Sequence, residues 1–268
     1  MTDSNNTENL PTVLILAGGL GTRLKSVVHD RPKALAQSAG VPFLEIQLQW
    51  LSHHGFKNIV LLTGHKSNQI ASYIGKNTTS NLTVKIVCEQ APLGTGGAII
   101  NALKELKLSE EFVLVNGDSI AEANLKKFCK VHCAGDNAAM VICYQEDASR
   151  YGTVNFDQDN KIVSFHEKNA NSKSGWINSG IYYFPKNWFD HAAKKKPISL
   201  EKDMIPLWLN EGRNLSVFRD LGRFIDIGTP ESYIQFNKEV QFWSSKHYQR
   251  QSSILNLFIN NQIMFYEI

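Results

Sequence analysis

At 268 residues, of which 43% are hydrophobic, the chain is long enough for one large domain, or for a domain with a small appendage, around a sizeable core. Its formal net charge of +3 suits an anionic substrate, but no basic run with interleaved aromatic residues indicates nucleic-acid binding. The sequence contains no run of about 18 apolar residues, so no membrane span is predicted. Residues 1–9 are polar and contain no apolar signal segment, so we expect residues 1–10 to be a disordered tail on a cytoplasmic protein.

A short buried strand is predicted at Thr12–Leu16, where a run of branched apolar residues ends before a glycine-rich stretch. Gly18, Gly19 and Gly21 follow Ala17 and let the backbone turn tightly and approach a ligand without a Cβ in the way. Successive exposed N–H groups in such a turn form a hollow that binds anions.

The residues after these glycines add polar and positive groups. Thr22 supplies a hydroxyl, and Arg23 and Lys33 supply positive charges that would meet phosphate oxygens. The dinucleotide pattern G-x-G-x-x-G would need a glycine in place of Leu24, and the Gly-Lys-Ser/Thr triplet of a P-loop is absent. The stretch therefore predicts a phosphate site of a third kind, the alternative being a glycine-rich turn with solvated basic residues.

Strands and helices then alternate along the first half of the chain. Strands are predicted at residues 58–63, 84–87 and 112–115. Helices are predicted at 43–51, between Gly64 and Ile74, at 94–106 and after Asn124. This order predicts a Rossmann-like α/β fold, an open and mainly parallel sheet with helices on both faces. Ligands of such sheets bind at the carboxyl ends of the strands, where the glycine-rich stretch, Glu89 and Asp118 would meet.

The pattern changes from about residue 138. Short strands are predicted at 139–144, 152–156, 162–165, 176–184 and 215–218, with helices at 200–209 and 230–241. We expect a mixed or antiparallel extension that would cover the mouth of the first sheet. The chain thus reads as one domain at 11–240 followed by an extension at 241–268, whose apolar spacing would allow it to pack on the domain or on a second copy of the chain, giving a homo-oligomer.

Two aspartates are candidate magnesium ligands. Asp118 follows a buried strand, where a carboxylate is well placed to hold Mg²⁺, although a solvated turn is an equal alternative. Asp226 lies between Ile225 and Ile227, and a buried charge needs a partner or a metal. Together the two acids would form a two-carboxylate Mg²⁺ site.

The cysteines indicate reduced thiols and no disulfide framework. They are Cys88, Cys129, Cys133 and Cys143. His132 beside two of them raises the alternative of a zinc site, but a second ligand pair at suitable spacing is missing. We expect a helix there instead, with Phe128 facing inward.

The run Gly-Gly-Leu-Gly-Thr-Arg-Leu at residues 18–24, with Pro32 and Lys33, resembles the signature of the sugar-1-phosphate nucleotidyltransferases. The resemblance implies their nucleotide-diphospho-sugar transferase fold, with a nucleotide half at 11–137 and a sugar-phosphate half at 138–240. It also implies Asp118 and Asp226, the latter in Asp-Ile-Gly-Thr-Pro, as the metal ligands. The implied nucleotide-binding residues are Leu16, Ala17, Gly18, Gly19, Gly21, Thr22, Glu89, Gly94, Thr95, Asn116 and Gly117.

In that family the loop at Gly94 to Gly97 lies beside the base and ribose, and the residue five before it reads the base. Here this residue is Glu89. One carboxylate can accept both N1–H and N2–H of guanine, whereas the single donor of uracil suits an amide better. The lean toward GTP is modest, because Glu89 could equally form a salt bridge or point to solvent.

The resemblance assigns the sugar phosphate to the second half of the chain. The implied residues are Gly152 after Tyr151, Glu167, Lys168, Asn178 and Gly180. Asn169 replaces the usual proline after Glu-Lys, and Ser26-Val-Val28 replaces the usual Pro-x-Thr. Without the resemblance, Glu167 and Lys168 would be read only as a turn.

Three motifs resemble the heptose-1-phosphate guanylyltransferases: residues 21–33 with Ser26-Val-Val28, Pro42-Phe-Leu-Glu45 and Pro92-Leu-Gly-Thr-Gly-Gly-Ala98. This resemblance covers residues 13–237. The implied reaction joins GTP and D-glycero-D-manno-heptose 1-phosphate into GDP-heptose and pyrophosphate for surface polysaccharides. Its implied catalytic residues are Arg23, Lys33, Asp118 and Lys168. Alternatives are a mannose-1-phosphate guanylyltransferase, an N-acetylmuramate-1-phosphate uridylyltransferase, or a nucleotide-sugar-binding regulator without catalysis.

Overall fold

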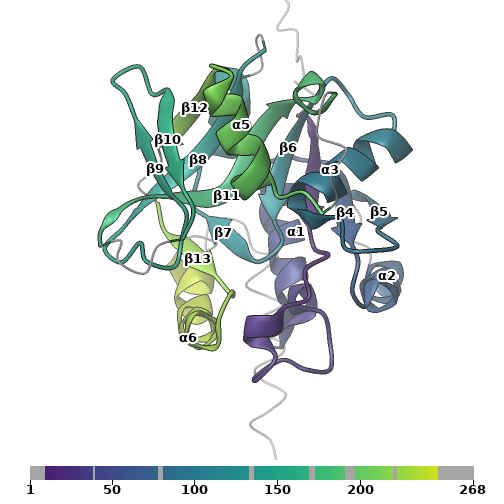
Figure 1. Ribbon diagram of the computed structural model, residues 1–268. Coiled ribbons are helices and arrows are strands. Elements are labelled where there is room, and N and C mark those ends of the chain that lie inside the picture. Colours follow the sequence, from purple (N-terminus) through teal and green to yellow (C-terminus); the bar gives the residue numbers. More distant parts are fainter. Residues whose placement is uncertain are drawn as a thin grey trace, which may run out of the picture.

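A computed structural model shows the arrangement of the chain (Figure 1). It describes residues 10–38, 40–77, 81–132, 136–168, 173–190, 197–219 and 222–246. The predicted N-terminal tail, Cys133, Asn169 and most of the 241–268 extension lie outside these ranges. Cys88, Cys129 and Cys143 form no disulfide bond in these ranges.

Four parallel strands form one half of the central sheet. They are β1 (Thr12–Leu16), β4 (Asn58–Thr63), β5 (Thr83–Cys88) and β6 (Glu111–Asn116). β1 lies between β4 and β6, and β5 flanks β4. Leu16 is level with both Leu62 and Asn116, so the carboxyl ends of three strands open at the same edge.

The second half of the chain continues the same sheet. Its strands are β8 (Ala138–Gln145), β9 (Thr153–Phe156), β10 (Ile162–His166), β11 (Gly175–Pro185) and β12 (Leu215–Arg219). β11 pairs antiparallel with β6, β8 and β9, while β12 pairs parallel with β8. The predicted mixed extension is confirmed, but these strands extend the sheet beside β6 and do not form a cover over its mouth.

Two short ribbons in the described chain were not predicted. They are β2 (Gln37–Ser38) with β3 (Val41–Pro42), and β7 (Ser119–Ala121) with β13 (Phe224–Asp226). Strands of two or three residues are too short to show a period in the sequence. The β7–β13 ribbon matters for the site because it joins two segments far apart in the chain.

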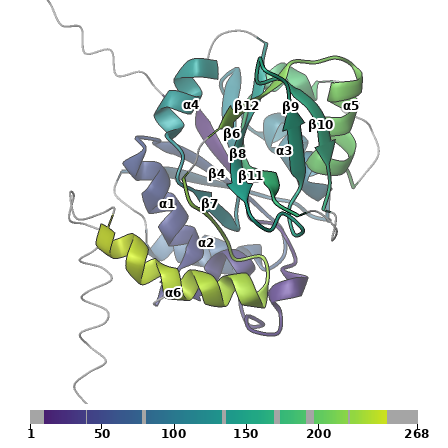
Figure 2. The ribbon, with the colours of Figure 1, turned by 90° about the vertical axis from the view of Figure 1, so that its left-hand side faces the viewer.

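Helices cover both faces of the sheet, as predicted (Figures 1 and 2). They are α1 (Phe43–His53), α2 (Ser67–Lys76), α3 (Gly94–Glu105), α4 (Leu125–His132), α5 (Ile205–Asn210) and α6 (Pro230–Lys246). Phe43 of α1 and Phe128 of α4 are buried in the core on one face, and Ile99 of α3 and Trp208 of α5 in the core on the other. In the described ranges no helix combines the length and apolar character that a membrane crossing requires.

The predicted helix at 200–209 consists of a π-helical turn at Leu200–Met204 that leads into α5. α6 packs near α1, where the Phe236 and Phe43 rings lie 5.3 Å apart between centroids (Figure 2). The segment before the π-helical turn runs against the start of α3, and Ile198 O accepts hydrogen bonds from Gly96 N and Gly97 N.

Candidate active site

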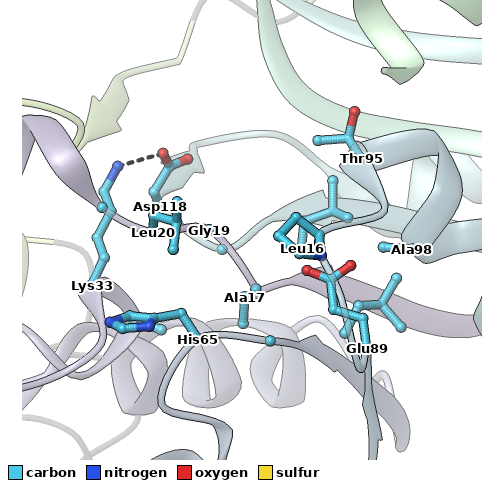
Figure 3. Close-up of a pocket in the computed structure, with 18 of the residues that line it drawn as sticks. Leu16, Ala17, Gly19, Leu20, Lys33, His65, Glu89, Thr95, Ala98 and Asp118 are labelled. Atoms are coloured by element: carbon cyan, nitrogen blue, oxygen red, sulfur yellow. Dashed lines mark hydrogen bonds and ion pairs between the residues drawn. The ribbon is translucent and has the colours of Figure 1, made fainter. Parts of the chain in front are cut away.

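A cavity of about 650 Å³ opens at the carboxyl edge of β1, β4 and β6 (Figure 3). Fourteen of the predicted site residues line it: Leu16, Ala17, Gly18, Gly19, Gly21, Thr22, Arg23, Lys33, Glu89, Gly94, Thr95, Asn116, Gly117 and Asp118. They come from four separate segments of the chain. The parallel strands bring these segments together, because their carboxyl ends share one edge of the sheet.

The glycine-rich stretch forms one wall of the cavity. A Cβ on Gly18 would lie 3.2 Å from Gly64 N and 3.3 Å from Glu89 Oε1, so this wall passes close to the segment after β4. Gly21, at φ 59°, begins a 3₁₀ turn at Thr22–Leu24. Arg23 lies in this turn and lines the cavity.

Lys33 and Asp118 form an ion pair at one end of the cavity (Figure 3). Lys33 begins a 3₁₀ turn at Lys33–Leu35, and its Nζ donates to Asp118 Oδ2 at 2.6 Å. Burial raises the pKa of Asp118, but the charge and hydrogen bond of Lys33, together with the weaker effects of the Lys168 and Arg23 charges, outweigh burial, so the pKa of Asp118 lies below its usual value. Asp118 is therefore ionised at neutral pH and available to a cation.

The β7–β13 ribbon places Asp226 beside Asp118. Asp226 lies opposite Ser119 in the ribbon, and Ile227 N donates to Asp118 O at 2.9 Å. A Cβ on Gly228 would lie 2.7 Å from Asp226 Oδ1 and 3.7 Å from Lys33 Nζ. The two acids and the ammonium thus gather at one place, although Asp226 does not line the main cavity.

The Asp226 carboxylate has several protein partners. It accepts hydrogen bonds from Gly228 N at 2.6 Å, Ser232 Oγ at 3.0 Å and the Arg150 guanidinium at 3.0 Å. The Tyr151 hydroxyl donates to its other oxygen, and burial together with Asp226 raises the pKa of Tyr151. The charge of Asp226, which lies between two isoleucines, thus has a protein partner, because the Arg150 guanidinium neutralises it.

These two carboxylates suit a divalent cation such as Mg²⁺ whose coordination shell is completed by water and substrate oxygens. Among the described residues, no group of three or more His, Cys, Asp and Glu side chains is arranged to hold a metal ion. Mg²⁺ does not need such a cage, because it is commonly bound by one or two carboxylates together with waters and substrate phosphates. A cation on both acids would compete with Lys33 for Asp118 and with Arg150 for Asp226.

The opposite end of the cavity contains Glu89 and the start of α3 (Figure 3). Glu89 Oε2 accepts from Leu93 N at 3.1 Å, which orients the carboxylate at the cavity wall. Gly94 has φ 77°, and a Cβ there would lie 2.4 Å from Ile198 O, so this position requires glycine. Thr95, next in α3, also lines the cavity.

The predicted sugar-phosphate residues do not line this cavity, but Gly180 and Lys168 interact with residues that do. Asn178 Nδ2 donates to the buried Tyr182 hydroxyl at 2.6 Å, and Asn178 Oδ1 accepts from Gly180 N at 2.9 Å. A Cβ on Gly180 would lie 2.4 Å from Asn116 Nδ2, so β11 touches the end of β6 here. Gly152 O accepts from Asn178 N at 2.9 Å. Glu167 and Lys168 follow β10, and the charge of Lys168 reaches Asp118.

Several lining residues were not predicted, among them Leu20, His65 and Glu201. Glu201 comes from the π-helical turn, more than a hundred residues after Thr95, whose hydroxyl donates to it at 2.8 Å. The sequence gives only a helical pattern around Glu201, and no motif links it to the glycine-rich stretch. His65 follows β4 as Asp118 follows β6, so its position after a strand was a usable signal.

Comparison with known proteins identifies the class to which this fold and site belong. Residues 12–241 match the family described as nucleotidyl transferase. The chain belongs to this family, whose members typically use a divalent metal.

Among individual proteins, the chain is 37% identical to the D-glycero-alpha-D-manno-heptose 1-phosphate guanylyltransferase of Campylobacter jejuni, over 83% of this chain and 97% of the relative. It is 33% identical to the protein of that name from Aneurinibacillus thermoaerophilus, over 86% and 98% of the two chains. A mannose-1-phosphate guanylyltransferase of Mycobacterium tuberculosis is 29% identical, over 83% of this chain and 62% of the relative.

A solved structure has the same fold. HddC from Yersinia pseudotuberculosis, complexed with GMP-PN, superimposes with a TM-score of 0.77 at 35% identity. The match covers 86% of this chain and all of HddC. The open, mostly parallel mixed sheet with helices is therefore that of nucleotidyltransferases.

Proposed function

We propose that this protein transfers GMP from GTP to D-glycero-α-D-manno-heptose 1-phosphate, giving GDP-heptose and pyrophosphate for surface polysaccharide synthesis. The observation that carries the proposal is the convergence of the glycine-rich stretch, Lys33 and the Asp118–Asp226 pair at one edge of the sheet. The names of relatives that match almost end to end support guanine and heptose as the specific substrates.

In this proposal the nucleotide binds in the main cavity, within residues 11–137, and the sugar phosphate binds beside it, within 138–240. Glu89 accepts from the guanine edge, and the N–H groups of Gly18 to Gly21 with Arg23 bind the triphosphate. Lys33 balances charge that develops around the α-phosphate, and Lys168 holds the sugar phosphate. An oxygen of the sugar phosphate attacks the α-phosphorus of GTP in line, and pyrophosphate departs.

Asp118 and Asp226 would hold Mg²⁺, which when bound neutralises the charge of the reacting phosphates. The protein needs no covalent nucleophile, because positioning and charge stabilisation suffice for this transfer. We place the reaction in the cytoplasm, with a second copy of the chain as a candidate partner through residues 241–268.

A pyrophosphate-release assay tests the proposal. GTP, UTP, ATP and dTTP are each combined with heptose 1-phosphate, mannose 1-phosphate and N-acetylmuramate 1-phosphate. We expect GTP with the heptose to give the highest kcat/KM. A preference for mannose 1-phosphate would establish the second candidate, which the 29% identical relative favours. Binding of GDP-heptose without any turnover would contradict an enzyme and indicate a regulator.

A further inference from the structure

Gln47 is a polar residue of α1 that the proposed mechanism does not use. Its side chain is fully buried, and three leucines of the same helix, Leu44, Leu48 and Leu51, belong to the hydrophobic core around it. α1 runs beside β7, and the Gln47 side chain reaches the start of that strand (Figures 1 and 2). An apolar side chain of similar size would fill this place without burying an amide, so the amide requires an explanation.

One turn of the chain uses the donors of the Gln47 amide. Nε2 donates to Asn116 O and to Ser119 O, each at 2.8 Å. Because both partners are carbonyl oxygens, the nitrogen of the amide and not its oxygen must face them. Among the described residues, Gln47 Oε1 is buried without a hydrogen-bond partner. The fold thus keeps the two contacts although they leave an acceptor unsatisfied, which is unfavourable.

The two carbonyls flank the candidate metal ligand Asp118. Asn116 ends β6 and Ser119 begins β7, with Gly117 and Asp118 between them. A single nitrogen that binds both carbonyls fixes the distance between the two ends of this turn. The direction in which the Asp118 carboxylate leaves the turn therefore depends on the Gln47 amide.

The same turn is connected to the sugar side of the site. Ser119 Oγ donates to Ser179 O at 3.1 Å, and both serines are buried. Ser179 lies between Asn178 and Gly180, two of the residues predicted to bind the sugar phosphate. A buried chain of hydrogen bonds thus runs from α1 through the Asp118 turn to β11.

We infer that Gln47 is a positioning residue, whose amide holds the β6–β7 turn so that the Asp118 carboxylate is placed for the reaction. Gln47 does not line the cavity, so it acts through the turn and not on the substrate. The reaction that it serves rests on the proposed function, whereas its hold on the turn can be measured without turnover. A merely structural glutamine would stabilise the packing of α1 and leave the turnover of the folded protein unchanged.

The first test is the Gln47→Met variant of the full chain, assayed by pyrophosphate release with GTP and the best sugar phosphate. Methionine fills a similar volume but offers no donor to either carbonyl. We expect kcat to fall about 10- to 100-fold, because a displacement of about 1 Å at a reacting site has an effect of this order. The KM for GTP should stay within about 3-fold, since the glycine-rich stretch and Glu89 make no contact with Gln47.

Two controls in α1 separate positioning from stability. Gln49→Met removes an amide that donates to Glu45 Oε1 at 2.8 Å, away from the turn. Leu48→Ala leaves a cavity in the core and lowers stability without removing a polar partner of the turn. In both variants kcat per folded molecule should stay within about 2-fold of the wild-type value. A fall in Leu48→Ala as large as that in Gln47→Met would assign the effect to stability and overturn the inference.

Hydrogen–deuterium exchange tests the hold on the turn without any substrate. We expect the amides of residues 117–119 to exchange about 10-fold faster in Gln47→Met than in the wild-type protein, and at the wild-type rate in Gln49→Met. Unchanged exchange in Gln47→Met would overturn the inference. Faster exchange with an unchanged kcat would do so too, because the turn would then be held without any effect on the reaction.

Two further outcomes are defined. If Gln47→Met does not fold, Gln47→Asn replaces it, because its amide is one methylene too short to bind both carbonyls, and the same changes in kcat and exchange are expected. If the wild-type protein transfers GMP to none of the sugar phosphates, the proposed function is wrong, and the exchange measurement alone decides whether Gln47 holds the turn. An active wild-type protein with an unaffected variant refutes the inference alone.

Discussion

Asp118 experiences two opposing influences, because burial disfavours its charge while Lys33, at 2.6 Å, stabilises it. The Asp118→Asn substitution keeps the size of the side chain but removes the charge that would hold Mg²⁺. We expect a folded protein whose turnover in pyrophosphate release falls about 100-fold or more. Asp159→Asn, in an exposed turn, should keep normal turnover. Normal pyrophosphate release by Asp118→Asn would remove this residue from the mechanism.

Glu89 is the residue on which the base preference depends. Its carboxylate is oriented by Leu93 N, and Glu89→Gln would place a donor against the donors of guanine. We expect kcat/KM for GTP to fall about 10-fold or more, the cost of an unsatisfied donor pair, and the ratio of GTP to UTP activity to fall with it. Glu105→Gln, at the exposed end of α3, is the control. An unchanged ratio would show that Glu89 does not read the base.

Site residues that belong to a contiguous sequence motif could be predicted, whereas site residues defined by contacts between distant segments could not. Gly18 to Arg23 and Glu89 line one cavity, as their positions after strands suggested, and Lys33 of the same motif lines it too. The sequence showed that Asp226 needs a partner, but it could not show that Arg150 is that partner. Glu201 escaped for the same reason, since its contact with Thr95 exists only after folding.

At the scale of elements, the contact between α3 and the 198–201 segment shapes the end of the cavity where we propose that the base and ribose bind. Gly94→Ala would place a Cβ 2.4 Å from Ile198 O at a positive φ. We expect this substitution to lower the free energy of unfolding by on the order of 3 kcal/mol and to raise the KM for GTP. Thermal unfolding and steady-state kinetics would measure both.

Gly75→Ala is the matched control in α2. A Cβ there meets no atom within 4 Å, and alanine favours a helix more than glycine does. We expect its stability to stay equal or to rise by about 0.5–1 kcal/mol. Equal effects of the two substitutions would contradict the close contact at Gly94.

Long strands with strong apolar runs were predicted within a residue, as β1 and β4 show. The β7–β13 ribbon was missed because its strands have three residues each. Apolar spacing predicts an ordinary helix at 200–209, and it does not separate a π-helical turn from an α-helix over a few residues.

At the scale of the whole molecule, His54 links stability to pH. Burial lowers its pKa to about 4, with smaller contributions from His53 and Lys126, whereas an unfolded histidine titrates near 6.5. The unfolded chain therefore binds the proton first, so stability is retained above pH 6.5 and falls as pH drops from 6.5 toward 4.

His54→Gln should weaken this acid dependence. We expect the loss of unfolding free energy between pH 6.5 and 4 to shrink by on the order of 2 kcal/mol, seen as a smaller fall in Tm across the same range. His29→Gln, at an exposed position, should follow the wild-type curve. A variant of His54 with an unchanged curve would assign the acid sensitivity to other groups.

The class of the fold could be predicted from the alternation of strands and helices, but the continuity of the sheet could not. The amino-acid sequence of β11 does not indicate that this strand pairs with β6 on one side and with β8 and β9 on the other. Such pairings depend on which edges remain open after the first strands have assembled.

The β7–β13 ribbon has a consequence for how the protein is made. At about 5–20 residues per second, the ribosome releases β6 and β7 several seconds before β13. A nascent chain thus contains the glycine-rich stretch and Asp118 while the second carboxylate is still unsynthesised. If both acids hold the metal, growing chains remain catalytically silent until β13 docks.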